Sequence, residues 1–162
     1  MISSFVKCLK HYKPWWVSII EGLIVQVVEY NSTSRDKRFV AIVNDYPELA
    51  HSMRDVLSQS VGAKVLAFTD PRTALEHFNL NYREYAVLIS DCVMPGMSGL
   101  EFLEKAKETC PSVLTIYTCG CGIYSEDQLR KYCDFVDKFL PIPFTMPDLI
   151  REVKECIRVP SI

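Results

Sequence analysis

The segment Tyr85–Leu100 reads YAVLISDCVMPGMSGL and contains a strand, a loop and the start of a helix. Tyr85–Ser90 is a continuous apolar run of the kind found in strands covered on both faces, and Asp91 follows it directly. Ser98 and Glu101 then form a capping box, which predicts that a helix begins there. A buried strand that leads through a short loop into a helix indicates an α/β architecture.

The same alternation continues on both sides of this segment. The predicted strands are Phe39–Val43, Ala63–Thr69, Tyr85–Ser90, Val113–Tyr117 and Phe135–Leu140. The predicted helices begin near Pro47, Pro71, Ser98, Ser125 and Thr145. Strands that alternate with helices in this way predict an α/β fold, a doubly wound five-stranded parallel sheet with helices on both faces.

Strand composition suggests the order of the sheet. The second strand carries Lys64, and the fifth carries Asp137 and Lys138, as edge strands tend to, whereas the other three are unbroken apolar runs. The first, third and fourth strands are therefore expected in the centre, which gives the order 2-1-3-4-5. This is the flavodoxin-like order, in which the site lies at the carboxyl ends of the first and third strands.

Length and composition exclude several classes of protein. The chain of 162 residues is 49% hydrophobic, which suits one core and excludes overall disorder. The net charge of −2 argues against a non-specific nucleic-acid binder. Seven cysteines, an odd number without regular spacing, favour a reducing cytoplasm over a secreted disulfide scaffold.

The first 37 residues differ from the rest of the chain. Trp15–Tyr30 is the most apolar stretch, but it is too short and, with Glu21 and Glu29, too charged to span a membrane comfortably. Its polar positions have helical spacing and predict an amphipathic helix that packs on the domain or on a second copy of itself. A strand over Leu23–Tyr30 is a competing interpretation, because Val and Ile are dense there. We therefore expect an N-terminal amphipathic segment and linker over 1–37 and a domain over 38–162.

Oxygen-bearing side chains follow three strands that the predicted order makes neighbours. Asn44 and Asp45 follow the first strand, Asp91 follows the third, and Thr118 follows the fourth. Carboxylate and amide oxygens suit Mg²⁺, which prefers few carboxylates together with water and phosphate oxygens. The sequence therefore predicts an oxygen-rich magnesium site at this edge of the sheet.

From about Arg38 to Val159 the chain resembles a response-regulator receiver domain of two-component signalling. The resemblance rests on Asn44-Asp45, on the Asp-x-x-Met-Pro-x-Met-x-Gly signature that begins at Asp91, on Thr118, and on Phe139–Phe144. It implies that Asp91 accepts a phosphoryl group from a histidine kinase or a histidine phosphotransfer protein.

The resemblance also implies the roles of the other site residues. Asp45, Asp91 and the backbone carbonyl of Val93 would hold Mg²⁺, with Asn44 as a weak further ligand. Thr118 would contact the phosphoryl group, and Phe139 would be the switch aromatic. The change would pass to a downstream protein through the face formed by the fourth helix, the fifth strand and the last helix. The resemblance further implies a domain that is not a conventional enzyme but that catalyses its own phosphorylation and dephosphorylation.

Two positions depart from the family. Asn44 replaces one carboxylate of the acidic pair, so the affinity for Mg²⁺ should fall. Ile142 stands directly before Pro143, where the family has a lysine that pairs with the phosphoryl group. A charge pair at about 4 Å is worth about 4 kcal/mol at an effective dielectric constant of ~20, before desolvation. Lys138 lies four residues back, roughly 13 Å along the strand, and is too far away to replace it.

Two functions remain open at this point. The first is a single-domain regulator that is phosphorylated on Asp91 with Mg²⁺ and signals by protein docking. The second is an atypical receiver that acts as a phosphorylation-independent interaction module. The N-terminal segment could make either one a homodimer. No direct contact with nucleic acid is expected.

The cysteines suggest a weaker idea. Cys92 follows Asp91, and Cys119 and Cys121 follow Thr118, so the three thiols are expected near one rim of the domain. A redox switch or a soft-metal site there competes with the simpler interpretation that these are small filling residues.

Overall fold

The computed structural model describes residues 38–120 and 134–158. The strands are β1 (Phe39–Val43), β2 (Lys64–Phe68), β3 (Tyr85–Asp91), β4 (Leu114–Gly120) and β5 (Lys138–Ile142). The helices are α2 (Pro47–Ser60), α3 (Pro71–Asn81), α4 (Gly99–Thr109) and α6 (Met146–Arg158), with a 3₁₀ turn, η1 (Tyr82–Glu84). By compactness the chain divides into Met1–Arg35 and Asp36–Ile162, and all described residues belong to the second unit. The N-terminal segment, Cys121 and the capping box at Ser125 lie outside the described residues.

The five strands form one parallel sheet in the order β2-β1-β3-β4-β5. The predicted fold class and strand order are therefore confirmed. β3 is buried from Tyr85 to Ser90, as expected of a central strand covered on both faces. Lys64 at the start of the edge strand β2 is exposed.

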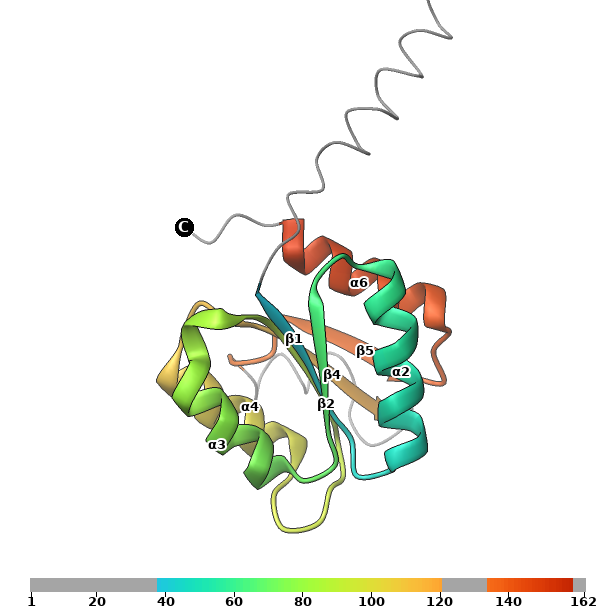
Figure 1. Ribbon diagram of the computed structural model, residues 1–162. Helices are drawn as coiled ribbons and strands as arrows, with labels where there is room; N and C mark the ends of the chain where they lie inside the picture. The colour runs from blue at the N-terminus through green and yellow to red at the C-terminus, as the bar shows by residue number, and fades with distance from the viewer. Residues whose placement is uncertain (1–37, 121–133, 159–162) are drawn as a thin grey trace, which may run out of the picture. The chain divides into compact units, whose positions relative to one another are not determined.

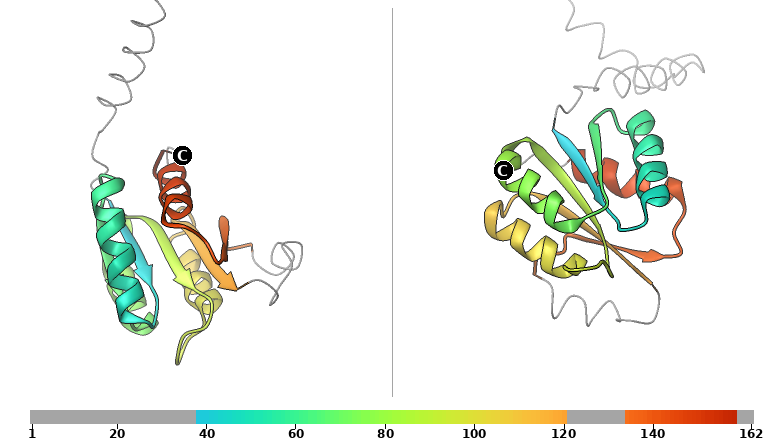
Figure 2. Two further views of the ribbon diagram at one scale, coloured as in Figure 1. Left: turned by 90° about the vertical axis from the view of Figure 1, so that its right-hand side faces the viewer. Right: turned by 60° about the horizontal axis from the view of Figure 1, so that its bottom comes forward.

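Helices cover both faces of the sheet (Figures 1 and 2). On the side of α3 and α4, the core contains Phe78, Leu88, Phe102 and Tyr117. On the side of α2 and α6, a second cluster contains Val40, Ile42, Met53, Leu57, Ile89, Ile116, Leu149 and Val153. The alternation of side chains along each strand divides them between these two layers.

The helices begin where their capping residues predict. Asp70 accepts a hydrogen bond from the Arg72 backbone N–H at 2.8 Å, ahead of α3. Ser98 accepts one from the Glu101 backbone N–H at 3.2 Å, ahead of α4. At α6, Thr145 and Asp148 satisfy each other's backbone N–H groups with their side chains.

The last strand begins later than predicted. The expected strand was Phe135–Leu140, but β5 runs from Lys138 to Ile142. The reason is that Thr115 binds the residues before it through its side chain, since its hydroxyl donates to the Phe135 carbonyl at 2.7 Å and accepts from the Asp137 N–H at 3.0 Å. These bonds replace the backbone ladder. β4 also continues past the predicted end to Gly120.

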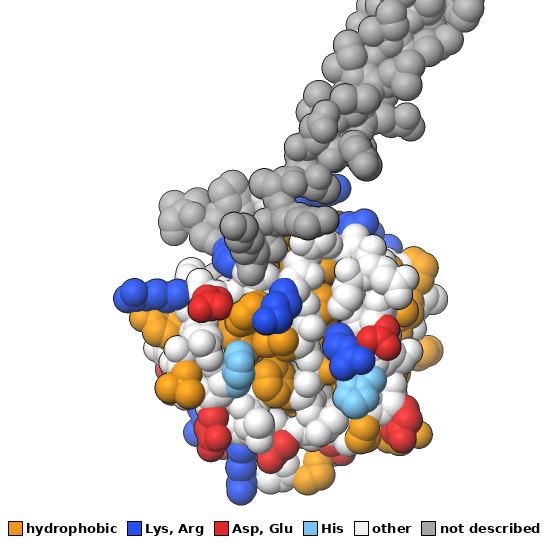
Figure 3. Space-filling model, in the orientation of Figure 1, with side chains coloured by type: hydrophobic (Ala, Val, Ile, Leu, Met, Phe, Trp, Pro, Cys, Tyr) orange, Lys and Arg blue, Asp and Glu red, His pale blue; other side chains and the backbone are white. Residues whose placement is uncertain are grey.

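The face that presents the edge strand β2 between α3 and α2 is mixed in charge. Figure 3 shows Lys and Arg side chains interspersed with Asp and Glu, with apolar side chains between them. This face has no continuous basic stripe of the kind that binds nucleic acid. Within the part of the chain that the structure describes, no helix is long and apolar enough to cross a membrane.

Candidate functional site

Asp91 and Thr118 lie opposite each other at the ends of adjacent strands. They are register partners in the pairing of β3 with β4. The Thr118 Oγ1 atom is 3.4 Å from Asp91 Oδ1 and 3.3 Å from the Ser90 carbonyl oxygen. Thr118 is buried, whereas Asp91 is partly exposed. The arrangement places a hydroxyl donor beside a carboxylate that solvent can still reach.

The surroundings of Asp91 oppose its negative charge. Burial raises the pKa of the Asp91 carboxyl above its ordinary value, and the negative charge of Asp45 raises it further. Hydrogen bonds from the Cys92 backbone N–H and from Thr118 act in the opposite direction. Asp91 and Asp45 thus interact electrostatically although they follow different strands.

The two members of the Asn44-Asp45 pair have different environments. Asn44 is buried, and its Oδ1 accepts a hydrogen bond from the Tyr46 backbone N–H at 2.9 Å. Its own backbone N–H donates to the Phe68 carbonyl at 3.1 Å, which ties the loop to β2. Asp45 is exposed. The amide oxygen of Asn44 therefore supports the turn, and Asp45 is the group free to act at the site.

Glycines shape the loop between β3 and α4. Gly96 has φ +79°, in the left-handed region that favours glycine. A Cβ atom on Gly99 would lie 1.9 Å from the Asp91 carbonyl oxygen, and the Gly99 N–H donates to the Cys92 carbonyl at 3.1 Å. The start of α4 is therefore packed directly against the backbone of Asp91. Val93, in the same loop, is 70% exposed.

β5 brings Phe139 and Ile142 to the other side of β4. Phe139 pairs with Tyr117 in the ladder, and their ring centroids are 6.3 Å apart. Ile142 pairs with Gly120 and is 37% exposed, so an apolar side chain faces solvent where the family has its lysine. Lys138 is bound to Glu152 on α6 at 2.9 Å and to Glu155 as well. It therefore does not replace the missing lysine.

The donor set fits a hard divalent cation. Asp45 and Asp91 would supply two carboxylates, and the exposed loop at Val93 would supply a backbone carbonyl oxygen. In the ranges 38–120 and 134–158, no three His, Cys, Asp or Glu side chains form a metal cluster. Few carboxylates with carbonyl and water oxygens suit Mg²⁺, whereas a soft metal would need more thiolate or imidazole ligands than Cys92 and Cys119 provide.

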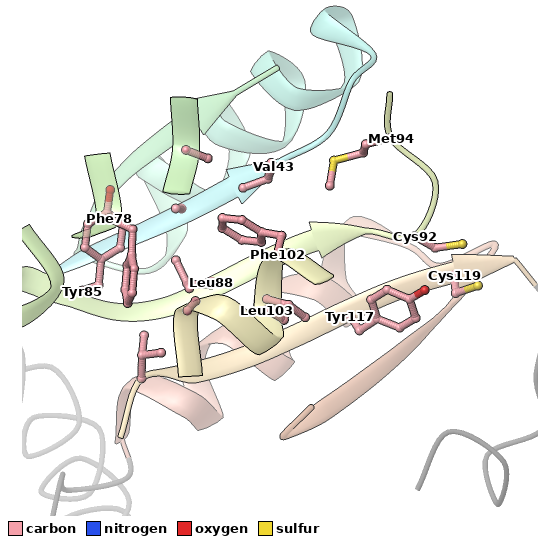
Figure 4. Packing of buried hydrophobic residues seen from close by; sticks show 14 residues of the cluster. Val43, Phe78, Tyr85, Leu88, Cys92, Met94, Phe102, Leu103, Tyr117 and Cys119 are labelled. Carbon is pink, nitrogen blue, oxygen red and sulfur yellow. The ribbon is translucent and has the colours of Figure 1, made fainter. Parts of the chain in front are cut away.

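The structure adds Tyr117 to the site's surroundings, a residue that the sequence prediction missed. Burial raises the pKa of Tyr117, and hydrogen bonds with the Cys92 and Cys119 thiols add to this effect. Burial also raises the pKa of Cys119 to about 12, and its hydrogen bond with Cys92 contributes. Residues 117 and 119 share a strand face because side chains alternate, which was the available signal. Figure 4 shows the three side chains together at the end of the sheet.

Comparison with known proteins identifies the domain. The family model of the response regulator receiver domain matches residues 40–154. The chain belongs to this family. The match includes every proposed site residue and confirms the resemblance. Receiver domains are signalling modules of two-component systems rather than conventional enzymes.

Curated relatives of this receiver domain are response regulators and a sensor kinase. Response regulator RppA of Synechocystis is 26% identical over 117 residues, which covers 71% of this chain and 48% of that protein. Regulatory protein VanRB of Enterococcus faecalis is 26% identical over 119 residues, 74% of this chain and 52% of that protein. Sensor kinase CckA of Brucella abortus is 34% identical over 76 residues, 46% of this chain and 8% of that protein. The chain thus spans about half the length of these regulators and a small part of the kinase.

Solved structures agree on the fold. A response regulator receiver domain protein from Clostridium thermocellum superposes with a TM-score of 0.67 at 22% identity, covering 74% of this chain and 94% of that one. The Francisella response regulator 1452 receiver domain superposes with a TM-score of 0.64 at 21% identity, covering 74% of this chain and 96% of that chain. The DrrB receiver domain, activated by BeF3, superposes with a TM-score of 0.62 at 22% identity, covering 76% of this chain and 99% of that chain.

Proposed function

We propose that this receiver domain accepts a phosphoryl group on Asp91 from a histidine kinase or a histidine phosphotransfer protein. The observation that carries the proposal is the partly exposed Asp91 carboxylate, with the Thr118 hydroxyl 3.4 Å away and Asp45 within electrostatic range. A carboxylate with this exposure can reach a phosphorus atom, and the neighbouring hydroxyl can then donate to a phosphoryl oxygen.

The chain's own residues supply most of this chemistry. An Asp91 carboxylate oxygen attacks phosphorus, and the bond from phosphorus to the donor nitrogen breaks as the histidine leaves with the electron pair. Thr118 donates to a phosphoryl oxygen, and the loop backbone that Gly99 supports holds Asp91 in place. Asp45, Asp91 and the Val93 carbonyl would hold Mg²⁺, with Asn44 as a weaker contributor, and the ion would neutralise phosphoryl oxygens.

The proposal extends to signalling by docking. Phe139 is half-buried and in contact with the core near Thr118, which suits a side chain that responds to a change at Asp91. The face that includes β5 and α6 would present that change to a downstream protein. Homodimerisation through residues 1–37, and a location in the cytoplasm, are further parts of the proposal.

Acetyl phosphate and beryllofluoride, each with Mg²⁺, test the proposal on the full chain. We expect acetyl phosphate to add one phosphoryl group, detected by mass, and beryllofluoride to bind. Asp91→Asn should abolish both results. Failure of both reagents to act on the wild-type chain in an Asp91-dependent manner would contradict the phosphoacceptor function.

Ile142→Lys provides a matched gain-of-function variant. A lysine at the family position would pair with the phosphoryl group, so beryllofluoride should bind at least about tenfold more tightly, equivalent to about 1.4 kcal/mol. Ile142→Met is the control of similar length without charge, and it should leave the affinity unchanged. Equal affinities for the lysine and methionine variants would contradict the role assigned to this position.

The second candidate function rests on the same departures. Ile142 removes the cation and Asn44 uses its oxygen to support a turn, so the domain has lost two charges of the family site. An interaction module that works without phosphate would show partner binding that is unchanged by Asp91→Asn.

A further inference from the structure

Two thiols meet directly beside Asp91 and Thr118. Cys92 follows Asp91 at the end of β3, and Cys119 follows Thr118 in β4. Cys92, Tyr117 and Cys119 belong to one buried cluster, and burial together with the proximity of the two thiols raises the pKa of the Tyr117 hydroxyl. Figure 4 shows the two sulfur atoms side by side at the end of the sheet.

We propose that Cys92 and Cys119 are a redox-active pair that closes an intramolecular disulfide when a disulfide oxidant such as glutathione disulfide is present.

The backbone geometry allows this bond. Asp91 and Thr118 are register partners on adjacent parallel strands, whose spacing is roughly 4.8 Å, and Cys92 and Cys119 are the residues that follow them directly. Disulfides occur with Cα separations of about 4.4–6.8 Å. Cys92 has already left the ladder of β3, so its side chain can approach Cys119 without breaking a strand pair.

Exposure sets the order of the two steps. Cys92 is 9% exposed and Cys119 is 1% exposed, so the oxidant meets Cys92 first. The Cys92 sulfur forms a mixed disulfide with one glutathione, and the other glutathione leaves with the electron pair and takes up the Cys92 proton. Cys119 must lose its proton to attack the Cys92 sulfur, and its raised pKa makes this the slower step. The second glutathione leaves with the electron pair and takes up the Cys119 proton. Two thiols are oxidised and one glutathione disulfide is reduced to two thiols.

The other described cysteines lack such a partner. Cys110 bonds to the Ser112 hydroxyl, with the sulfur and oxygen atoms 3.4 Å apart, and Cys156 is buried among the apolar residues packed beneath α6. Of the four free cysteines in the described residues, Cys92 and Cys119 are the two that share one buried cluster and interact electrostatically with each other. This makes Cys110 and Cys156 suitable internal controls.

Peptide mapping of the full chain after incubation with glutathione disulfide tests the pairing. We expect a cross-linked peptide pair that joins Cys92 to Cys119, a loss of about two mass units, and full reversal by a thiol reductant. Cys119→Ala should leave glutathione attached to Cys92, whereas Cys110→Ala should leave the cross-link unchanged. A bond from Cys92 to Cys121, or no cross-link at all, would overturn the proposal. Because the main measurement uses the wild-type chain, its result does not depend on whether a cysteine variant folds.

The disulfide would also affect Asp91, an extension that rests on the proposed function. A phosphoryl group must fit beside the Asp91 oxygen that now lies 3.4 Å from Thr118, so the ends of β3 and β4 must adjust. A disulfide between Cys92 and Cys119, which follow Asp91 and Thr118 in the sequence, would oppose this adjustment. We expect the oxidised chain to bind beryllofluoride about tenfold more weakly than the reduced chain.

The two proposals fail separately. Equal beryllofluoride affinities of the oxidised and reduced chains would contradict the coupling between the thiols and Asp91. Absence of beryllofluoride binding in the reduced chain would contradict the phosphoacceptor function, whereas the map of the Cys92–Cys119 bond does not depend on phosphate chemistry.

Discussion

At the scale of single residues, Asp91 is held in surroundings that favour its protonated form. Its pKa is raised by burial and by Asp45, so the native state binds this proton more tightly than the unfolded chain does. A carboxyl group with a raised native pKa lowers the free energy of unfolding as the pH rises from the ordinary value of 3.8 through the native value. Its charge therefore destabilises the fold at neutral pH.

Asp91→Asn should raise the melting temperature by a few degrees at neutral pH, because it removes this charge and keeps the shape of the side chain. The difference should narrow as the pH falls toward 3.8, where the wild-type carboxyl is protonated. Melting curves of both proteins across this range measure the effect. A difference in melting temperature that stayed constant with pH would show that the charge of Asp91 does not cause it.

Gly99→Ala should destabilise the domain by about 3 kcal/mol, because the new Cβ would collide with the Asp91 carbonyl and with the Ser90 side chain. Urea denaturation measures the change in the free energy of unfolding. Gly120→Ala is the matched control, since a Cβ there meets no atom within 4 Å. Equal effects of the two substitutions would contradict the close approach at Gly99.

Sequence patterns located these residues to different degrees. Asp91, Asp45 and Thr118 were predicted because each follows a recognisable apolar run and parallel strands end at one edge. The hydrogen bond from Tyr46 to Asn44 and the contact of Tyr117 with two thiols were missed, since both depend on side-chain direction rather than on residue type.

At the scale of secondary-structure elements, side chains decide where β5 begins. Asp137 Oδ2 accepts from the Thr115 N–H at 2.8 Å and pairs with Lys107 on α4 at 2.7 Å. Together with the Thr115 hydroxyl, these contacts join the start of β4, the end of α4 and the residues before β5. The apolar run from Phe135 predicted an earlier strand because hydrophobicity does not distinguish ladder bonds from side-chain bonds.

Thr115→Val should lower the free energy of unfolding by about 2 kcal/mol, because it leaves the Phe135 carbonyl and the Asp137 N–H without their partner. Thr109→Val is the control, since that hydroxyl is exposed and water can replace its bonds to Asn79 and Lys105. Thr109→Val should lower the free energy of unfolding by less than about 0.5 kcal/mol. Urea denaturation of both variants compares them, and a small effect at Thr115 would rule out the network as the anchor of β5.

In helix α2, hydrophobic periodicity predicts only part of the buried face. Leu49, Met53, Val56 and Leu57 have the spacing of an apolar helical stripe, but the buried residues are Ala50, Met53 and Leu57. Leu49 is 37% exposed, and Val56 is half-buried. The small side chain of Ala50 allows the helix to approach the sheet closely, so its face is rotated from the one that hydrophobicity favours.

At the scale of the whole molecule, the order of the sheet was predictable because charges mark its edges. Lys64 and Lys138 lie in β2 and β5, and the strands without lysine or arginine fill the centre. The division into an N-terminal segment over 1–37 and a domain over 38–162 stays a prediction.

Removal of residues 1–35 should leave the melting temperature of the domain unchanged, because Asp36–Ile162 is a compact unit with its own sheet and two apolar layers. Calorimetry of the full and shortened chains measures this, and a large decrease would show that the segment supports the fold. Light scattering on both chains measures their mass, and an unchanged oligomeric state would argue against dimerisation through the N-terminal segment.

The contact of Gly99 with Asp91 has a mechanical consequence. No side chain separates the first turn of α4 from the end of β3. The helix and the end of the strand are therefore in direct contact at Gly99, and we expect them to move together. We expect a displacement of the Asp91 backbone by a few tenths of an ångström to shift the first turn of α4, because Gly99 leaves no space between them. The far end of that helix, at Lys107, is joined to the residues before β5. Direct contacts through α4 thus connect the carboxyl end of β3 with the residues before β5, at the opposite end of the sheet.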